Sequence, residues 1–236
     1  MDPVSKKGPW AKAKLVFRLG LLVVAVALNF IAPEVLDFRL IFQMGIESAF
    51  LWAIWLMIFV MMLFRIIPNK LTTVGARKHF RSSYLEVHNP KAANPDMHKG
   101  AVKSALSWFG ITAGIVLIFW GLGLLTPGVV VVLTIIYSLC DSFFVMFKCP
   151  FRLLYLNNRC CADCRIYNWD NMMMCAPLIV FPSVFSTSLF LLALAIIVLW
   201  EIRLIKNPRF FSREFNANLR CENCGEKKCT RGGGRA

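Results

Sequence analysis

Long apolar runs decide what this chain can fold into. Four of them, each close to the roughly 20 helical residues that cross a bilayer, cover residues 15–32, 48–67, 104–125 and 128–147. In all, 58% of the residues are hydrophobic, against roughly 45–50% in soluble domains. A lipid-embedded backbone has to satisfy its own hydrogen bonds, and a helix does so within one segment. The sequence therefore predicts an all-α polytopic membrane protein in which residues 1–147 form a region of four transmembrane helices.

A fifth apolar segment, residues 172–200, does not have the length of a simple span. It is too long for one perpendicular crossing and too short for two complete ones. Pro177 and Pro182 interrupt its first half, and proline breaks a helix because it lacks a backbone donor. Two arrangements are open: one long, kinked and tilted helix, or a short re-entrant arm followed by a nearly full span. We favour the re-entrant arm, because it returns the basic tail, residues 201–236, to the side of the other basic segments.

The charged residues predict an orientation in the membrane. Lys and Arg outnumber Asp and Glu by 27 to 13, and they concentrate in the N-terminal segment, the loop 65–103, the segment 148–171 and the tail. The loop 33–47 is acidic instead. Because Lys and Arg mark cytoplasmic loops, we expect an inner (cytoplasmic) membrane, with the N-terminus and the cysteine-rich face cytoplasmic. The scatter of basic residues over several loops indicates contact with anionic lipid headgroups and no binding of nucleic acid.

Eight of the nine cysteines fall in two windows, residues 149–175 and 221–229, and each window contains one C-x-x-C pair. Two thiolates at this spacing hold one metal ion from a tight turn, and two such pairs complete a closed tetrahedral site. Thiols stay reduced on the cytoplasmic side, which favours metal binding over disulfides. We interpret residues 148–171 as a Cys-rich interfacial loop that a small cytoplasmic knuckle joins to the tail. Structural zinc is the favoured metal, and its predicted ligands are Cys161, Cys164, Cys221 and Cys224.

The remaining cysteines leave other chemistry open. A larger ligand set would suit iron or an iron–sulfur cluster. A C-x-x-C dithiol could instead carry out redox chemistry with quinone, although that chemistry favours the oxidising side of a membrane. Cys175 lies in apolar sequence, where a buried and inert thiol is common. The secondary candidate ligands are Cys149, Cys160, Cys175 and Cys229.

The sequence contains no nucleotide-binding loop, catalytic triad or histidine metal site with an open position, which favours a non-enzymatic role. Our first hypothesis is an integral membrane subunit or scaffold whose metal site presents a basic cytoplasmic face to a protein partner or to a second copy of the chain. The alternative is a membrane electron-transfer protein with an iron or iron–sulfur site that acts with quinone or a redox partner. A second alternative is a small transporter or channel that uses Asp141, a costly carboxylate within the fourth apolar run.

Overall fold

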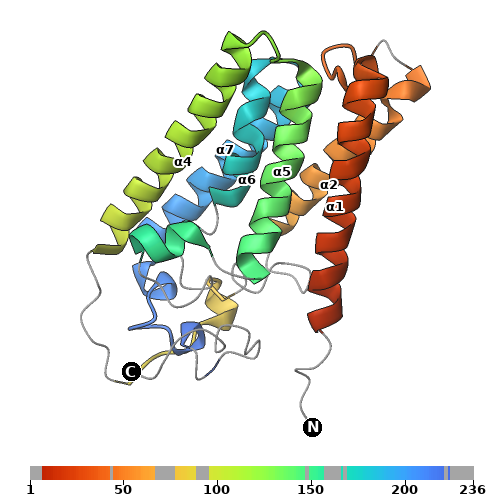
Figure 1. The fold of residues 1–236 in the computed structure, drawn as a ribbon. Coiled ribbons are helices and arrows are strands. Elements are labelled where there is room, and N and C mark those ends of the chain that lie inside the picture. Colours follow the sequence, from red (N-terminus) through yellow and green to blue (C-terminus); the bar gives the residue numbers. More distant parts are fainter. Residues whose placement is uncertain are drawn as a thin grey trace.

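The computed structural model describes residues 7–42, 45–66, 78–88, 96–146, 149–156, 166, 169–220 and 223 (Figure 1). Five of its helices are long and apolar enough to cross a membrane: α1 (Lys7–Ile31), α2 (Ala49–Ile66), α4 (Asp96–Gly121), α5 (Pro127–Met146) and α7 (Val184–Lys206). The described residues form no β-strand beyond a single antiparallel bridge between Glu86 and Asn216. The predicted all-helical architecture is confirmed for these residues, and the five apolar helices are compatible with an integral membrane protein.

Short helical segments connect and flank the long helices. Two of them follow α1 and precede α2, one lies between α2 and α4, and the others flank α7 or follow α5. They are η2 (Pro33–Leu36), η3 (Gly45–Ser48), η4 (Arg81–Ser83), η5 (Arg152–Leu156), α6 (Asp170–Cys175), η8 (Ala176–Val180), η9 (Pro208–Phe211) and η10 (Ala217–Leu219).

The apolar segment 172–200 is divided into two helical pieces. α6 and η8 run without interruption to Val180, and α7 begins at Val184. Pro182 lies in the break between them. Ser183 then caps α7, because its hydroxyl accepts from the backbone N–H of Ser186 while its own N–H donates to the Ser186 hydroxyl. The proline and this capping box together end one piece and start the next, so the stretch consists of a short arm followed by a full-length helix.

The interior of the bundle is built around this short arm. α1 packs against α5, α2 packs against α7, and α6 with η8 contacts both α5 and α7 (Figure 1). The side chains between them are apolar and closely packed. Fully buried examples are Leu36, Phe38, Leu51, Met62, Val130, Leu178, Leu189 and Ile196.

The two ends of the bundle differ in charge. We call the end where α1 and α4 begin and α2, α5 and α7 finish the basic end. The Lys and Arg residues near the ends of these helices are Lys14, Arg18, Arg65, Lys99, Lys103, Arg203 and Lys206. The opposite end carries η2 and η3 with Glu34 and Asp37, and the single described cation there, Arg39, pairs with Asp37.

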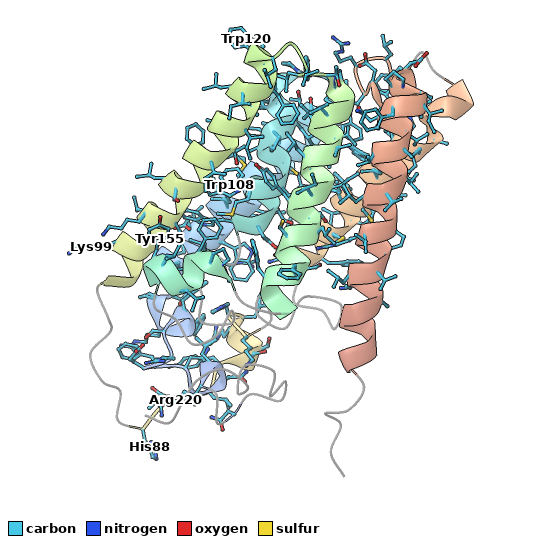
Figure 2. The ribbon with its side chains drawn as sticks, viewed as in Figure 1. His88, Lys99, Trp108, Trp120, Tyr155 and Arg220 are labelled. Carbon is cyan, nitrogen blue, oxygen red and sulfur yellow. The ribbon has the colours of Figure 1, made fainter. Side chains whose placement is uncertain are left out.

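At the basic end, η5 lies directly against the first turns of α4. A Cβ at Gly100 would lie 2.5 Å from the carbonyl oxygen of Tyr155 and 3.2 Å from Cδ2 of Leu156. The Tyr155 hydroxyl donates to Oγ of Ser107 at 3.2 Å, and Figure 2 shows Tyr155 beside the lower half of α4. Gly100 therefore permits the close approach that holds η5 in place.

Replacing Gly100 with alanine is expected to push η5 away from α4. The new methyl group would meet backbone atoms of Tyr155, which cannot rotate away as a side chain could. Overpacking of this kind costs about 1–3 kcal/mol, and we expect a lower thermal unfolding temperature in detergent. Gly110→Ala is the matched control, because a Cβ there meets nothing within 4 Å and alanine favours helix. Equal unfolding temperatures for the two variants would contradict the close approach.

Candidate metal centre and a buried charge cluster

Most of the predicted metal ligands lie outside the described residues. These are Cys160, Cys161, Cys164, Cys221, Cys224 and Cys229. Of the described cysteines, Cys149 and Cys140 are half-buried, and Cys175 is completely buried within the apolar core. Across the described ranges, no group of three or more His, Cys, Asp or Glu side chains could hold a metal ion. The knuckle therefore stays a prediction, and the structure describes the segments that lead into it.

The first cysteine window is anchored on both sides of residues 157–165. Leu156 and Ile166 are both buried in one small apolar cluster with Ala101 of α4. Trp169 packs against this cluster, and its indole N–H donates to the carboxylate of Glu201 on α7 at 3.0 Å. The window is thus attached to the basic ends of two long helices.

The second cysteine window follows a docked segment of the tail. Residues 207–220 pack on residues 78–88, and we call these two segments together the cap. The backbone N–H of Ala217 donates to the carbonyl oxygen of Leu85 at 2.7 Å, and that of Val87 donates to Phe215 at 3.3 Å. Figure 2 shows His88 and Arg220, one from each segment, at the same lower edge of the molecule. The tail is therefore held against the loop between α2 and α4.

Asn216 is the centre of the cap and is completely buried. Its amide nitrogen donates to the carbonyl oxygens of Lys78 and Phe210 at 3.2 and 3.0 Å. Its amide oxygen accepts from the backbone N–H of Asn218 at 3.1 Å and from that of Leu85 at 3.4 Å. One side chain thus satisfies backbone groups of both cap segments, which buried polar groups require.

An aromatic cluster joins the cap to the long helices. The His79 ring stacks on Phe211 with centroids 4.7 Å apart, and its edge meets Trp200 of α7. The Arg203 guanidinium lies 5.0 Å from the ring centroids of Phe80 and Trp200. Its Nη2 donates to the carbonyl oxygen of Ile66 at the end of α2, at 3.0 Å. The end of α7 is therefore fixed beside the end of α2.

Asp141, the carboxylate singled out within the fourth apolar run, lies opposite a cation from another helix. Its Oδ2 is 3.5 Å from Nη1 of Arg18 on α1. The same Arg18 nitrogen donates to the carbonyl oxygen of Ser138 and to the hydroxyl of Ser142. Arg18 is only 8% exposed, so these groups of α5 replace most of the water around its guanidinium.

A second ion pair lies nearby and involves residues that sequence reasoning missed. Arg65 at the end of α2 donates to the carboxylate of Asp170 at the start of α6, and both side chains are largely buried. Burial raises the pKa of Asp170 to about 6, because the loss of hydration outweighs the favourable charge of Arg65.

The two ion pairs form one electrostatic unit. The charges of Asp141 and Arg18 both act on the pKa of Asp170, the first raising it and the second lowering it. Lys14 of α1 lies within the electrostatic reach of Arg18, Arg65 and Asp141. We call these five residues the charge cluster. It links α1, α2, α5 and α6 at the basic end, where the buried guanidinium groups of Arg18 and Arg65 each lie beside a carboxylate.

The chain matches no protein-family model, no curated protein and no solved structure. Its function has to be argued from the residues themselves.

Proposed function

We propose that the chain is a non-enzymatic integral membrane subunit or scaffold. In this proposal a cytoplasmic metal site, ligated by Cys161, Cys164, Cys221 and Cys224, clamps the loop 148–171 to the tail and presents a basic face to a protein partner. The observation that supports it best is that both segments leading into these cysteines are attached to the basic end of the bundle. The loop is attached through the apolar cluster around Ile166, and the tail is attached through the cap around Asn216.

The path of the chain supports the topology that such a clamp needs. α7 finishes beside the end of α2, through the hydrogen bond from Arg203 to Ile66. The tail would then return to the side of the loop 65–103, and α6 with η8 would form the re-entrant arm. Because Lys and Arg gather at this end while Glu34 and Asp37 lie at the other, the positive-inside rule makes the basic end cytoplasmic.

The exposed surface of the cap supports a partner of acidic character. Its exposed charged side chains are mostly cationic, and opposite charges steer and orient association. Glu86 is the exposed acid among the cap residues. The exposed cap arginines are Arg81, Arg209 and Arg213.

The charge cluster supports a scaffold more than a transporter. Asp141 lies beside Arg18 and Asp170 is bonded to Arg65, so each carboxylate has a compensating cation from another helix. Such pairs fix the relative positions of four helical elements, which a scaffold requires.

We expect the purified full-length chain to contain about one zinc ion and to be colourless, as a closed four-thiolate site implies. Changing Cys221 and Cys224 to serine should remove the metal, because two thiolates alone hold zinc far more weakly. Metal content by mass spectrometry of the anaerobically purified protein checks both outcomes. Cys140→Ser is the control and should keep the full metal content. Iron with strong visible absorption would replace the zinc proposal with the electron-transfer alternative, and metal-free protein would contradict both.

A further inference from the structure

Two hydrogen-bond donors near the end of α7 are buried without an acceptor. They are the indole Nε1 of Trp200 and the guanidinium Nη1 of Arg203, and neither has a hydrogen-bond partner among the described residues. Trp200 is only 2% exposed. In the described part of the chain no carboxylate forms an ion pair with Arg203. The acceptor that the structure does provide for Arg203, the carbonyl oxygen of Ile66, carries no charge.

The two donors belong to one site. Residues three apart are neighbours on a helix surface, and the Arg203 guanidinium lies 5.0 Å from the centroid of the Trp200 ring. The pair therefore presents two unused N–H groups, one of them on a permanent cation. A phosphate suits this combination, because its oxygens are charged and accept several hydrogen bonds.

The cap covers this pair with two phenylalanine rings. Trp200 meets Phe80 and Phe211 edge-on, with ring centroids 5.4 and 5.9 Å apart, and the Arg203 guanidinium lies 5.0 Å from the Phe80 centroid. Figure 1 shows both cap segments below the lower end of α7. Docking of the cap thus removes the pair from water without supplying an acceptor for either donor, and this opposes the docked state.

The pair lies at the depth of the lipid headgroups. About 20 helical residues cross the hydrocarbon, and Arg203 is the twentieth residue of α7 counted from Val184. Trp and Arg are both favoured at this boundary, because their apolar parts stay in the hydrocarbon while their N–H groups reach the headgroups. Ile202 and Ile205, on either side of Arg203 in the sequence, are 42% and 77% exposed, so they are available to acyl chains.

We propose that Arg203 and Trp200 form a binding site for the phosphate of an anionic phospholipid, and that the cap is a lid over this site. The lipid binds the open state, in which the unused N–H groups donate to its phosphate oxygens, and it thereby shifts the cap from docked to open. In the absence of the lipid, the hydrogen bonds of Asn216 hold the lid closed. The proposal does not rest on the metal clamp. Because the tail that continues to Cys221 is part of the lid, anionic lipid would control where the second cysteine window lies.

The test is hydrogen exchange, read by mass spectrometry, of the full-length protein in nanodiscs of phosphatidylcholine with or without phosphatidylglycerol. The backbone N–H of Ala217 is bonded to Leu85 in the docked cap, so its exchange rate reports the open population. We expect phosphatidylglycerol to speed this exchange about tenfold, the factor that one hydrogen bond to a charged group contributes. Equal exchange in the two lipids would overturn the proposal.

Two variants assign the effect to the pair. Each is compared with itself in the two lipids, so that a change in the basal docking of the cap does not enter the comparison. Arg203→Met removes the cation and should abolish the acceleration. Trp200→Phe removes one neutral donor and should reduce the acceleration about fivefold. If either variant keeps the full acceleration, that residue does not hold the lipid and the proposal is wrong.

Two controls separate this site from general charge attraction and from free anions. Lys103→Gln removes an exposed cation from the same end of the bundle and should keep the full acceleration; a loss equal to that of Arg203→Met would overturn a localised site. Inorganic phosphate, compared with chloride at equal ionic strength in phosphatidylcholine nanodiscs, should leave the exchange unchanged. Acceleration by phosphate alone would assign the pair to a soluble anion and overturn the lipid assignment.

Discussion

Replacing Asn216 with alanine is expected to release the tail from the helix bundle. The variant loses the two hydrogen bonds from the Asn216 amide to the carbonyl oxygens of Lys78 and Phe210 and the one that its amide oxygen accepts from Asn218. An unsatisfied buried group costs about 1–3 kcal/mol, so we expect the docked state of the cap to lose about 3 kcal/mol. Local opening should increase on the order of a hundredfold, while the spans remain folded.

Limited proteolysis with trypsin measures this opening, because cleavage of a transiently open segment tracks its open population. The arginines of the docked tail provide the cleavage sites: Arg209, Arg213 and Arg220. Asn216→Asp should behave like the alanine variant, since a carboxylate cannot donate to the carbonyl oxygens of Lys78 and Phe210. Asn218→Ala is the milder control, because it removes a single bond to Ser83 at 2.9 Å. Wild-type protection in the Asn216 variants would mean that the cap is not held in this way.

The release of the tail also bears on the proposed metal clamp. If the clamp forms, metal should partly rescue the docking of the tail in Asn216→Ala, because binding to the docked state stabilises it by mass action. If metal does not change the protection of the tail, the cap would still stand as a structural feature. The cap would then no longer support the proposed metal clamp.

The parts of the fold that could be predicted are those that lipid imposes locally. An apolar run in a bilayer has to be helical, so the spans follow from composition alone. The break before α7 also has a local cause, because Pro182 and Ser183 adjoin each other in the sequence. Asp141 can be singled out for a similar reason, since a single carboxylate within an apolar run is conspicuous.

The residues that sequence reasoning missed owe their roles to contacts between distant segments. Arg65 and Asp170 lie at the ends of apolar segments, where charged residues are ordinary, and their pairing depends on how α2 and α6 pack. Asn216 lies in a polar tail in which no periodicity marks a buried side. Propensity and spacing report on neighbours along the chain. They carry no information about a hydrogen bond from the tail to residue 78.

Removing one partner of the Arg65–Asp170 pair is expected to have the largest effect on the stability of the helix bundle. Breaking a buried ion pair from one side costs about 3–5 kcal/mol, because it leaves the other charge buried and uncompensated. Replacing both partners with apolar side chains, as in Arg65→Met/Asp170→Leu, should be neutral or stabilising. The free energy of unfolding, measured by denaturant titration in detergent micelles, separates these outcomes. The Asp37–Arg39 pair is the control: Arg39 is exposed, so Asp37→Asn should cost no more than about 1 kcal/mol.

The two single variants should differ in their dependence on pH. In Arg65→Met, the remaining Asp170 can take up a proton and become neutral, so the loss of stability should be smaller at pH 5 than at pH 8. In Asp170→Asn, the remaining Arg65 cannot lose its proton, so the loss should not become smaller at pH 5. The stability of the wild-type protein should also depend on pH through Asp170. Its Asp170 pKa of about 6 lies above the ordinary value of 3.8, so the folded state binds more protons between these values.

The contribution of Asp170 to the free energy of unfolding should therefore fall as the pH rises from about 4 to about 6, and then level off. The difference between wild type and Asp170→Asn isolates this slope from the other carboxylates. For Asp37 the sign is opposite: the hydrogen bond from Arg39 lowers its pKa, so its contribution is lost as the pH falls. A slope in wild type that Asp170→Asn leaves unchanged would show that Asp170 is not buried in the charge cluster. In that case the linkage of α2 to α6 would have to rest on apolar packing alone.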